Sequence, residues 1–266
     1  MAYQLVAADL DGTLRAEHKP FTPRVRAALK RAESRGVRVV MATGRMFRTA
    51  APFAADLGLQ TPLVCDHGAT IHDVTTNEIL YEKRVPLDLV REVCKVADGK
   101  LTLIACLDDE FYTQRATEDA VAFTGRFTEE HLHTVSNLGS FLTVAPQKLV
   151  FVNAQEVTSR LFVDLTDHFG GRLQVVQSYV RYVELTHREA SKGNAIAWLA
   201  DRWQIRREQV IAIGDQHNDI SMIQWAGLGV AMGNAVDSVK AAAGWLAPAA
   251  EEDGAAAVIE RFVLGE

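Results

Sequence analysis

The stretch Leu5-Val6-Ala7-Ala8-Asp9-Leu10-Asp11-Gly12-Thr13 ends an apolar run in two carboxylates that are one residue apart. The run is short and rich in small apolar residues, which is typical of a parallel strand buried on both faces. Asp9 would then stand at the carboxyl end of this strand, where open α/β sheets bind their ligands. Gly12 permits a tight turn, and Thr13 offers a hydroxyl to an anionic group. Taken alone, the motif fits an ordinary acidic turn as well as it fits a catalytic loop, and only a calcium loop is disfavoured, since no glutamate stands at the twelfth position.

Polar groups follow other apolar strands in the same way. A strand predicted over Val37–Ala42 ends in Thr43-Gly44-Arg45, and a helix comes next. Free amides at a helix N-terminus, with a cation nearby, form a phosphate-binding environment, although Thr43-Gly44 taken alone fits an ordinary strand-to-helix turn with a capping threonine better. A buried strand over Val210–Ile213 ends in Gly214-Asp215, and Asn218-Asp219 opens the helix that follows.

Lys192 opens another predicted helix, with Ser191 as its possible cap. A cation is disfavoured at a helix N-terminus, which favours a functional role for this lysine over an ordinary surface position. Four candidate sites therefore lie at strand ends or beside them: Asp9/Asp11/Thr13, Thr43/Gly44, Lys192 and Asp215/Asn218/Asp219.

The order of the predicted elements indicates an α/β fold with an insertion. Strands and helices alternate as βαβαβ up to about residue 84, which indicates a doubly wound, mainly parallel, Rossmann-like sheet. Helices and mostly antiparallel strands then alternate, beginning with a helix over Asp88–Ala97 and a strand over Leu101–Ala105. We therefore predict a core made of residues 1–84 and 187–266, with residues 85–186 forming an inserted α+β domain.

Composition narrows the class of protein. The chain has 266 residues, of which 48% are hydrophobic and 23% charged, as in ordinary globular proteins. The net charge of −6 argues against a nucleic-acid surface. No stretch approaches a transmembrane length, and the strand-like run begins too early for a signal peptide. The three cysteines, Cys65, Cys94 and Cys106, are widely spaced, which fits a reducing cytoplasm. The composition fits a monomer or a weak homodimer.

The four sites together resemble the haloacid dehalogenase-like hydrolases, which are aspartate-based phosphatases. The resemblance rests on DLDGT (9–13), TGR (43–45), Lys192 in ASKGNA, and GDQHNDISM (214–222). It covers nearly the whole chain. Because the insertion falls between the second and third motifs, the chain is most similar to the branch with a large α/β cap. Within that branch, AMGNA (231–235) is similar to the Cof-like phosphatases.

The resemblance implies a Mg²⁺-dependent phosphatase. Asp9 is the implied nucleophile, Asp11 the general acid and base, and Lys192 a catalytic cation. The implied metal ligands are Asp9, Asp11 through its main-chain carbonyl, Asp215 and, directly or through water, Asp219. The implied phosphate-binding residues are Leu10, Thr13, Thr43, Gly44, Lys192 and Asn218. Residues 85–186 would form the cap, which selects the substrate.

Some points stay open from the sequence. His67, in Asp66-His67-Gly68-Ala69, stands where the family more usually has Asn-Gly-Ala, and it either contacts substrate or caps a turn. Arg45 contacts substrate or the cap, or is exposed to solvent. The resemblance implies that the substrate is a small phosphorylated metabolite: a sugar phosphate, another small metabolite phosphate, or a cofactor phosphate such as flavin or pyridoxal phosphate. The alternatives to a phosphatase are a sugar phosphomutase of the same superfamily and a non-catalytic protein that binds phosphorylated ligands.

Overall fold

The computed structural model describes residues 2–125 and 131–266, and the chain forms two compact units. The first unit runs to Arg45 and also includes Ala50–Tyr81 and Ser191–Glu266. The second unit comprises Met46–Thr49 and Glu82–Ala190. Among the described residues, no helix combines the length and the apolar character that crossing a membrane requires.

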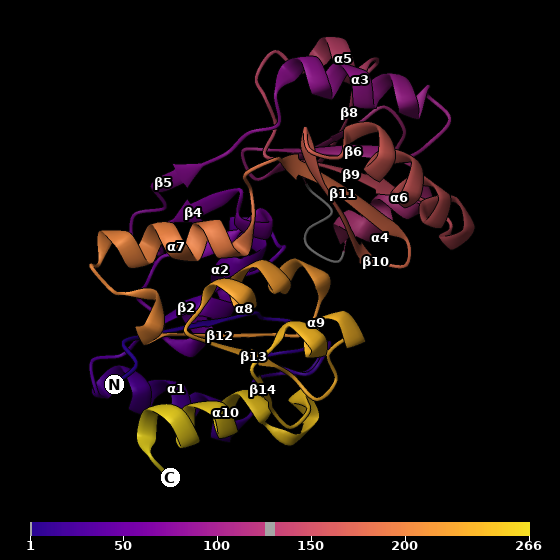
Figure 1. Ribbon diagram of the computed structural model, residues 1–266. Coiled ribbons are helices and arrows are strands. Elements are labelled where there is room, and N and C mark those ends of the chain that lie inside the picture. The colour runs from indigo at the N-terminus through magenta and orange to yellow at the C-terminus, as the bar shows by residue number, and fades with distance from the viewer. Residues whose placement is uncertain (1, 126–130) are drawn as a thin grey trace. The chain divides into compact units, whose positions relative to one another are not determined.

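A parallel sheet in the order β14-β13-β12-β1-β2 forms the centre of the first unit (Figure 1). Every residue of β1 is fully buried, because the sheet is covered on both faces. A small sheet in the order β3-β4-β5, in which β3 and β4 pair antiparallel, adjoins the end of β2 through a bridge between Ala42 and Val64. The strands of this unit are β1 (Leu5–Ala8), β2 (Arg38–Met41), β3 (Leu63–Cys65), β4 (Thr70–His72), β5 (Ile79–Glu82, whose last residue is grouped with the second unit), β12 (Val210–Gly214), β13 (Leu228–Ala231) and β14 (Trp245–Leu246).

Helices lie on both faces of this parallel sheet, as a doubly wound fold requires. On one face α1 packs beside α10, and on the other α7 packs beside α8 (Figure 1). Leu5 and Ala7 of β1 join the same apolar cluster as Ile196 of α7 and Met222 of α8. The helices are α1 (Pro23–Ser34), α2 (Phe47–Leu57, whose first turn is grouped with the second unit), α7 (Lys192–Arg202), α8 (Ile220–Trp225), α9 (Asp237–Ala242) and α10 (Gly254–Ile259).

The second unit is an α+β structure on a six-stranded sheet in the order β10-β11-β9-β6-β7-β8. Its pairs are antiparallel except for β7 and β8, which run parallel. Its strands are β6 (Leu103–Leu107), β7 (Glu110–Thr113), β8 (Leu132–Thr134), β9 (Lys148–Val152), β10 (Leu173–Tyr179) and β11 (Tyr182–His187). Its helices are α3 (Leu87–Ala97), α4 (Glu118–Gly125), α5 (Leu138–Phe141) and α6 (Gln155–Phe169).

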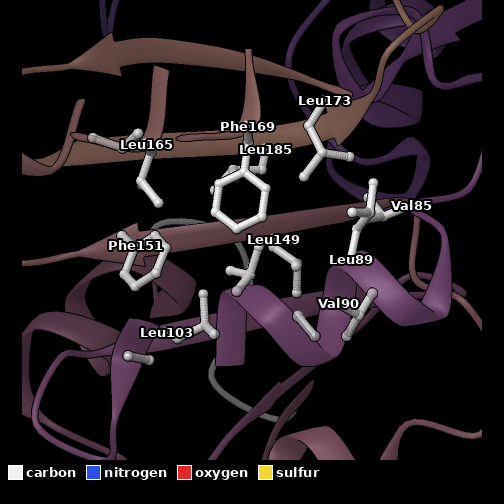
Figure 2. Close-up of a cluster of buried hydrophobic side chains, with 14 of the residues drawn as sticks. Val85, Leu89, Val90, Leu103, Leu149, Phe151, Leu165, Phe169, Leu173 and Leu185 are labelled. Atoms are coloured by element: carbon white, nitrogen blue, oxygen red, sulfur yellow. The ribbon is translucent and has the colours of Figure 1, made fainter. Parts of the chain in front are cut away.

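Alternating side chains of this sheet separate into two apolar clusters. Figure 2 shows the cluster in which Leu149 and Phe151 of β9 pack with Leu89 of α3 and Phe169 of α6. Val150 belongs to the other cluster, in which Phe123 of α4 takes part. The predicted fold class is therefore confirmed. Within it, the strand expected over Leu101–Ala105 lies later, at β6, and the helix expected at Asp88 begins at Leu87.

Candidate active site

The predicted site residues of the first unit meet at one edge of the parallel sheet. Strand β1 lies between β2 and β12, and the carboxyl ends of parallel strands meet at the same edge. Asp9 directly follows β1 and Asp215 directly follows β12. The main chain ties these ends together, since the Asp9 amide donates a hydrogen bond to the Ile213 carbonyl at 3.0 Å.

A buried lysine connects the acidic residues. The Lys192 ammonium Nζ donates to Asp9 Oδ1 at 2.5 Å and to Asp219 Oδ1 at 2.6 Å. The Lys192 side chain is 0% exposed, so these two carboxylates replace the water that an ammonium normally holds. Asp219 Oδ2 in turn accepts hydrogen bonds from the main-chain amides of Asp215 and Gln216, both at 2.9 Å. Asp219 therefore holds both Lys192 and the loop that carries Asp215.

The local sequence explains why Lys192 reaches this position. The Ser191 side chain caps α7 by accepting a hydrogen bond from the Asn194 amide, as predicted. Gly68 lies directly against the main chain at this point, because a Cβ on Gly68 would come within 2.2 Å of the Ser191 carbonyl oxygen. Gly68 also has φ +94°, a conformation that favours glycine. The start of α7 is thus packed against the turn that follows β3.

The DLDGT loop is shaped to meet Asp215. Gly12 has φ +86°, and a Cβ there would lie 2.4 Å from Asp215 Oδ2, so no larger residue fits without movement. Thr13 Oγ1 donates to Asp215 Oδ1 at 2.9 Å, and Gln216 Nε2 donates to Asp215 Oδ2 at 3.1 Å. Thr13 is thus a partner of Asp215 in this structure.

Burial and neighbouring charges shift the pKa values of the acidic side chains in this group. Burial raises the pKa of Asp9 well above its ordinary value, although Lys192 opposes the change. Burial, followed by the neighbouring Asp219 charge, raises the pKa of Asp215 to about 7. Burial alone would lower the pKa of Lys192, but the Asp219 and Asp9 carboxylates outweigh it and raise that pKa. Buried carboxylates outnumber the single ammonium here, so the group has an affinity for added positive charge.

The same carboxylates fit a metal ion. Asp9, Asp215 and Asp219 each offer a carboxylate oxygen, and these oxygens lie within 4.8 Å of one another. Oxygen donors of this kind suit a hard divalent cation such as Mg²⁺. Asp219 Oδ1 accepts from the Lys192 ammonium and Asp219 Oδ2 accepts from two main-chain amides, whereas the oxygens of Asp215 accept from the side chains of Thr13 and Gln216. The arrangement favours Asp9 and Asp215 as direct ligands.

The raised Asp215 pKa predicts how stability of the metal-free protein depends on pH. A carboxyl whose pKa moves from 3.8 to about 7 on folding binds its proton more tightly in the folded state. Its contribution to the free energy of unfolding is therefore complete below about pH 4 and is lost as pH rises through 7, by on the order of 2–4 kcal/mol.

Urea unfolding at pH 5 and pH 8 in EDTA measures this loss. We expect Asp215→Asn to lose much less stability over that interval than the unsubstituted protein, and Mg²⁺ at pH 8 to restore stability only where Asp215 is present. Equal pH slopes for the two proteins would contradict the prediction.

A second group of predicted residues surrounds His67. A Cβ on Gly44 would come within 2.3 Å of the His67 ring, so the ring lies directly on Gly44. On its other side, the Asn218 side-chain amide and His67 Nδ1 are 2.9 Å apart in a hydrogen bond. The His67 amide also donates to the Thr43 carbonyl at 3.1 Å. His67 is 4% exposed and connects the residues predicted to hold phosphate, Thr43, Gly44 and Asn218.

Arg45 lies against Asp11. Arg45 Nε donates to Asp11 Oδ2 at 2.6 Å, and Arg45 Nη2 donates to Asp11 Oδ1 at 3.1 Å. Burial would raise the pKa of Asp11, but Arg45 and Arg15 more than offset it and lower that pKa. The Arg45 side chain is 18% exposed and is paired with Asp11, and contact of Arg45 with substrate or with the cap stays a prediction.

The structure adds residues that the sequence did not single out. Arg15 joins Arg45 on Asp11, with Nη2 3.0 Å from Oδ1. Asn234, within the AMGNA run, donates from Nδ2 to the Gly12 carbonyl at 2.9 Å, and its Oδ1 accepts from the Ala250 amide. A polar residue after a strand was the available signal for Asn234, whereas nothing in the sequence indicates that Arg15 turns back towards Asp11.

Comparison with known proteins identifies the family. A family model described as haloacid dehalogenase-like hydrolase matches residues 6–259. The Bacillus subtilis protein YxeH is 31% identical over 99% of this chain and 100% of its own length. The Escherichia coli pyridoxal phosphate phosphatase YbhA is 30% identical over 91% of this chain and 92% of its own. A solved haloacid dehalogenase-like hydrolase from Bacteroides thetaiotaomicron superposes with a TM-score of 0.84 at 30% identity, covering 97% of this chain and 99% of that one.

The chain belongs to the haloacid dehalogenase-like hydrolase family. The resemblance inferred from the four motifs is thereby confirmed, as is the enzyme class, a phosphoric monoester hydrolase.

Proposed function

We propose that this protein is a Mg²⁺-dependent phosphatase that hydrolyses a small phosphorylated metabolite through a phospho-aspartyl intermediate on Asp9. The observation that carries the proposal is the buried group in which Lys192 pairs with Asp9 and Asp219 beside Asp215. Such a group combines a fixed nucleophile, a buried cation and oxygen ligands for a metal. The family membership and the similarity to a pyridoxal phosphate phosphatase support it.

The first half of the reaction transfers the phosphoryl group to Asp9. A phosphate monoester is an anion and hydrolyses very slowly unaided, so the site has to supply positive charge and hold the reactants in line. A carboxylate oxygen of Asp9, oriented by Lys192, forms a bond to phosphorus while the bond to the leaving oxygen breaks. Asp11 gives its proton to that leaving oxygen. The arginines favour the Asp11 carboxylate, whereas the bound phosphate charge favours its protonated form.

The second half returns the enzyme to its starting state. The Asp11 carboxylate takes a proton from water, and the water oxygen attacks phosphorus and releases Asp9 with inorganic phosphate. Thr43, the main-chain amides of Leu10, Thr13 and Gly44, the Asn218 side chain and Lys192 are the donors we assign to the phosphoryl oxygens. A Mg²⁺ ion held by Asp9, Asp215 and the Asp11 carbonyl, with Asp219 in support, would neutralise part of the developing charge.

We also propose which part of the chain carries out catalysis and which part selects the substrate. Residues 1–84 and 187–266 form the catalytic core, and residues 85–186 form the inserted domain that selects the substrate. A cytoplasmic location fits the three cysteines, which are free thiols in the structure. We expect a monomer or weak homodimer and no nucleic-acid or membrane partner.

Phosphate release tests the proposal. We expect the purified protein to hydrolyse 4-nitrophenyl phosphate with Mg²⁺, to stop in EDTA, and to recover when Mg²⁺ is added back. A panel of hexose phosphates, flavin mononucleotide and pyridoxal 5′-phosphate then identifies the substrate class by its kcat/KM. No phosphate release from any of these esters would reject the proposal. Conversion of a hexose 1-phosphate into its isomer without phosphate release would indicate a mutase instead.

A further inference from the structure

The loop after β1 turns back so that Arg15 reaches Asp11. The Gly12 amide donates to the Arg15 carbonyl at 2.9 Å, and the Arg15 amide donates to the Leu10 carbonyl at 3.2 Å. The side chain follows the same direction, since Arg15 Nε donates to Asp11 Oδ1 at 3.1 Å and Nη2 lies 3.0 Å from the same oxygen. Main chain and side chain together therefore hold Arg15 on Asp11.

A second arginine meets the same carboxylate, and one aromatic ring supports both. Arg45 bonds to Asp11 through Nε and Nη2, at 2.6 and 3.1 Å. The guanidinium carbons of Arg15 and Arg45 lie 4.5 and 5.1 Å from the centre of the Phe53 ring. Phe53 itself packs edge-on against Phe21, with 6.2 Å between the ring centres. We call Arg15, Arg45 and Phe53 the arginine clamp.

The geometry of the clamp restricts how the Asp11 carboxylate can turn. A guanidinium is a rigid planar fork, and stacking on an aromatic ring fixes its plane. Arg45 contacts both carboxylate oxygens of Asp11, and Arg15 makes two further donor contacts with Oδ1. The side chains of Arg15 and Arg45 are 10% and 18% exposed, so water competes weakly for these bonds. Rotation of the carboxylate would break bonds to two supported groups at once.

We propose that Arg15 is a positioning residue for Asp11, which holds the carboxylate where it can exchange a proton with the leaving oxygen. This inference rests on the proposed function. Arg15 acts through the Asp11 side chain, to which its guanidinium donates. A misplaced proton donor matters most when the leaving oxygen is a poor leaving group, so the role of Arg15 depends on the substrate's leaving group.

Leaving-group dependence of kcat/KM tests the role, because this constant includes departure of the leaving group. The substrates are 4-nitrophenyl phosphate, whose leaving group departs easily, and the best alkyl phosphate of the panel. We expect Arg15→Met to lower kcat/KM for the alkyl ester by about 10–100-fold and for the aryl ester by only about threefold, with KM little changed. Arg15→Lys should recover part of the loss, since an ammonium still donates to Oδ1.

Two further variants serve as references for the Arg15 result: one removes the carboxylate of Asp11, and the other is a matched control. Asp11→Asn should show the largest selective loss for the alkyl ester. Arg26→Met is the matched control, because Arg26 also stacks on a phenylalanine, Phe21 at 5.5 Å, but pairs with the exposed Asp56. We expect Arg26→Met to retain both activities.

The outcomes separate the inference from the proposed function. If the unsubstituted protein hydrolyses neither ester, both are rejected. If it is active and Asp11→Asn is selective, but Arg15→Met changes neither ester or lowers both equally, Arg15 has no positioning role and the phosphatase proposal stands. If Asp11→Asn itself lacks selectivity, Asp11 does not protonate the leaving oxygen and the role of Arg15 is rejected with it.

Discussion

Replacing Asp9 by asparagine is expected to lower turnover of 4-nitrophenyl phosphate by on the order of 10⁴-fold or more, as removal of a nucleophile does in other enzymes. The amide nitrogen and oxygen cannot form the acyl phosphate that the carboxylate forms. The fold should survive, because burial already favours the uncharged form of Asp9 and asparagine has the same shape. Lys192 keeps its second partner, Asp219, at 2.6 Å.

The measurement combines activity with stability. Initial rates with Mg²⁺ give the loss of activity, and urea unfolding shows whether Asp9→Asn remains folded. Asp56→Asn is the control, since Asp56 is an exposed carboxylate of the same unit that pairs with Arg26. Acid quenching during turnover should trap a phosphorylated protein only when Asp9 is present. Full activity in a folded Asp9→Asn protein would exclude Asp9 as the nucleophile.

The sequence predicted which residues meet in the site because the rule behind it is topological. Parallel strands present their carboxyl ends at one edge, so Asp9, Thr43 and Asp215 had to lie near one another once their strands were recognised. Lys192 was recognisable because a cation at a helix N-terminus is unfavourable unless something compensates it. The structure supplies that compensation in the carboxylates of Asp9 and Asp219.

Contacts made by turns were not predictable in the same way. Asp66, His67 and Gly68 all have positive φ, a run of left-handed residues that places the His67 ring between Gly44 and Asn218. No hydrophobic periodicity records such a turn. Arg15 is a similar case, because its position depends on how the DLDGT loop closes on itself.

In the second unit, some short elements could not be predicted from the sequence for a different reason. Strand β8 and the single-turn helix α5 were not predicted, because β8 is short and mostly polar and α5 buries only Leu138. Strand β6 was displaced because the apolar run that begins at Leu101 extends through Leu107, so the sequence does not mark its first paired residue. Short elements that are stabilised mainly by neighbouring strands have too few residues to show a hydrophobic periodicity of their own.

The second large effect is expected from Lys192→Met, which keeps the bulk of the side chain and removes its charge. Asp9 and Asp219 would then face each other, buried and without their shared cation, and breaking such a buried pair costs on the order of 3–5 kcal/mol of the free energy of unfolding. Turnover should fall at least about 10³-fold, because the nucleophile loses the group that orients it and the phosphoryl oxygens lose a donor.

The pH dependence of this loss identifies its cause. Removing the ammonium takes away the charge that opposes the effect of burial on Asp9, so the pKa of the Asp9 carboxyl rises further above its value in the unfolded chain. The folded variant then binds protons more tightly than the unfolded one, so its stability is retained in acid and lost as pH rises. We expect urea unfolding to show a small defect near pH 5 and a large one at pH 8, partly reversed by Mg²⁺. Lys30→Met, at an exposed position of α1, should show neither effect. A defect of the same size at both pH values would mean that Lys192 contributes through packing and not through its charge.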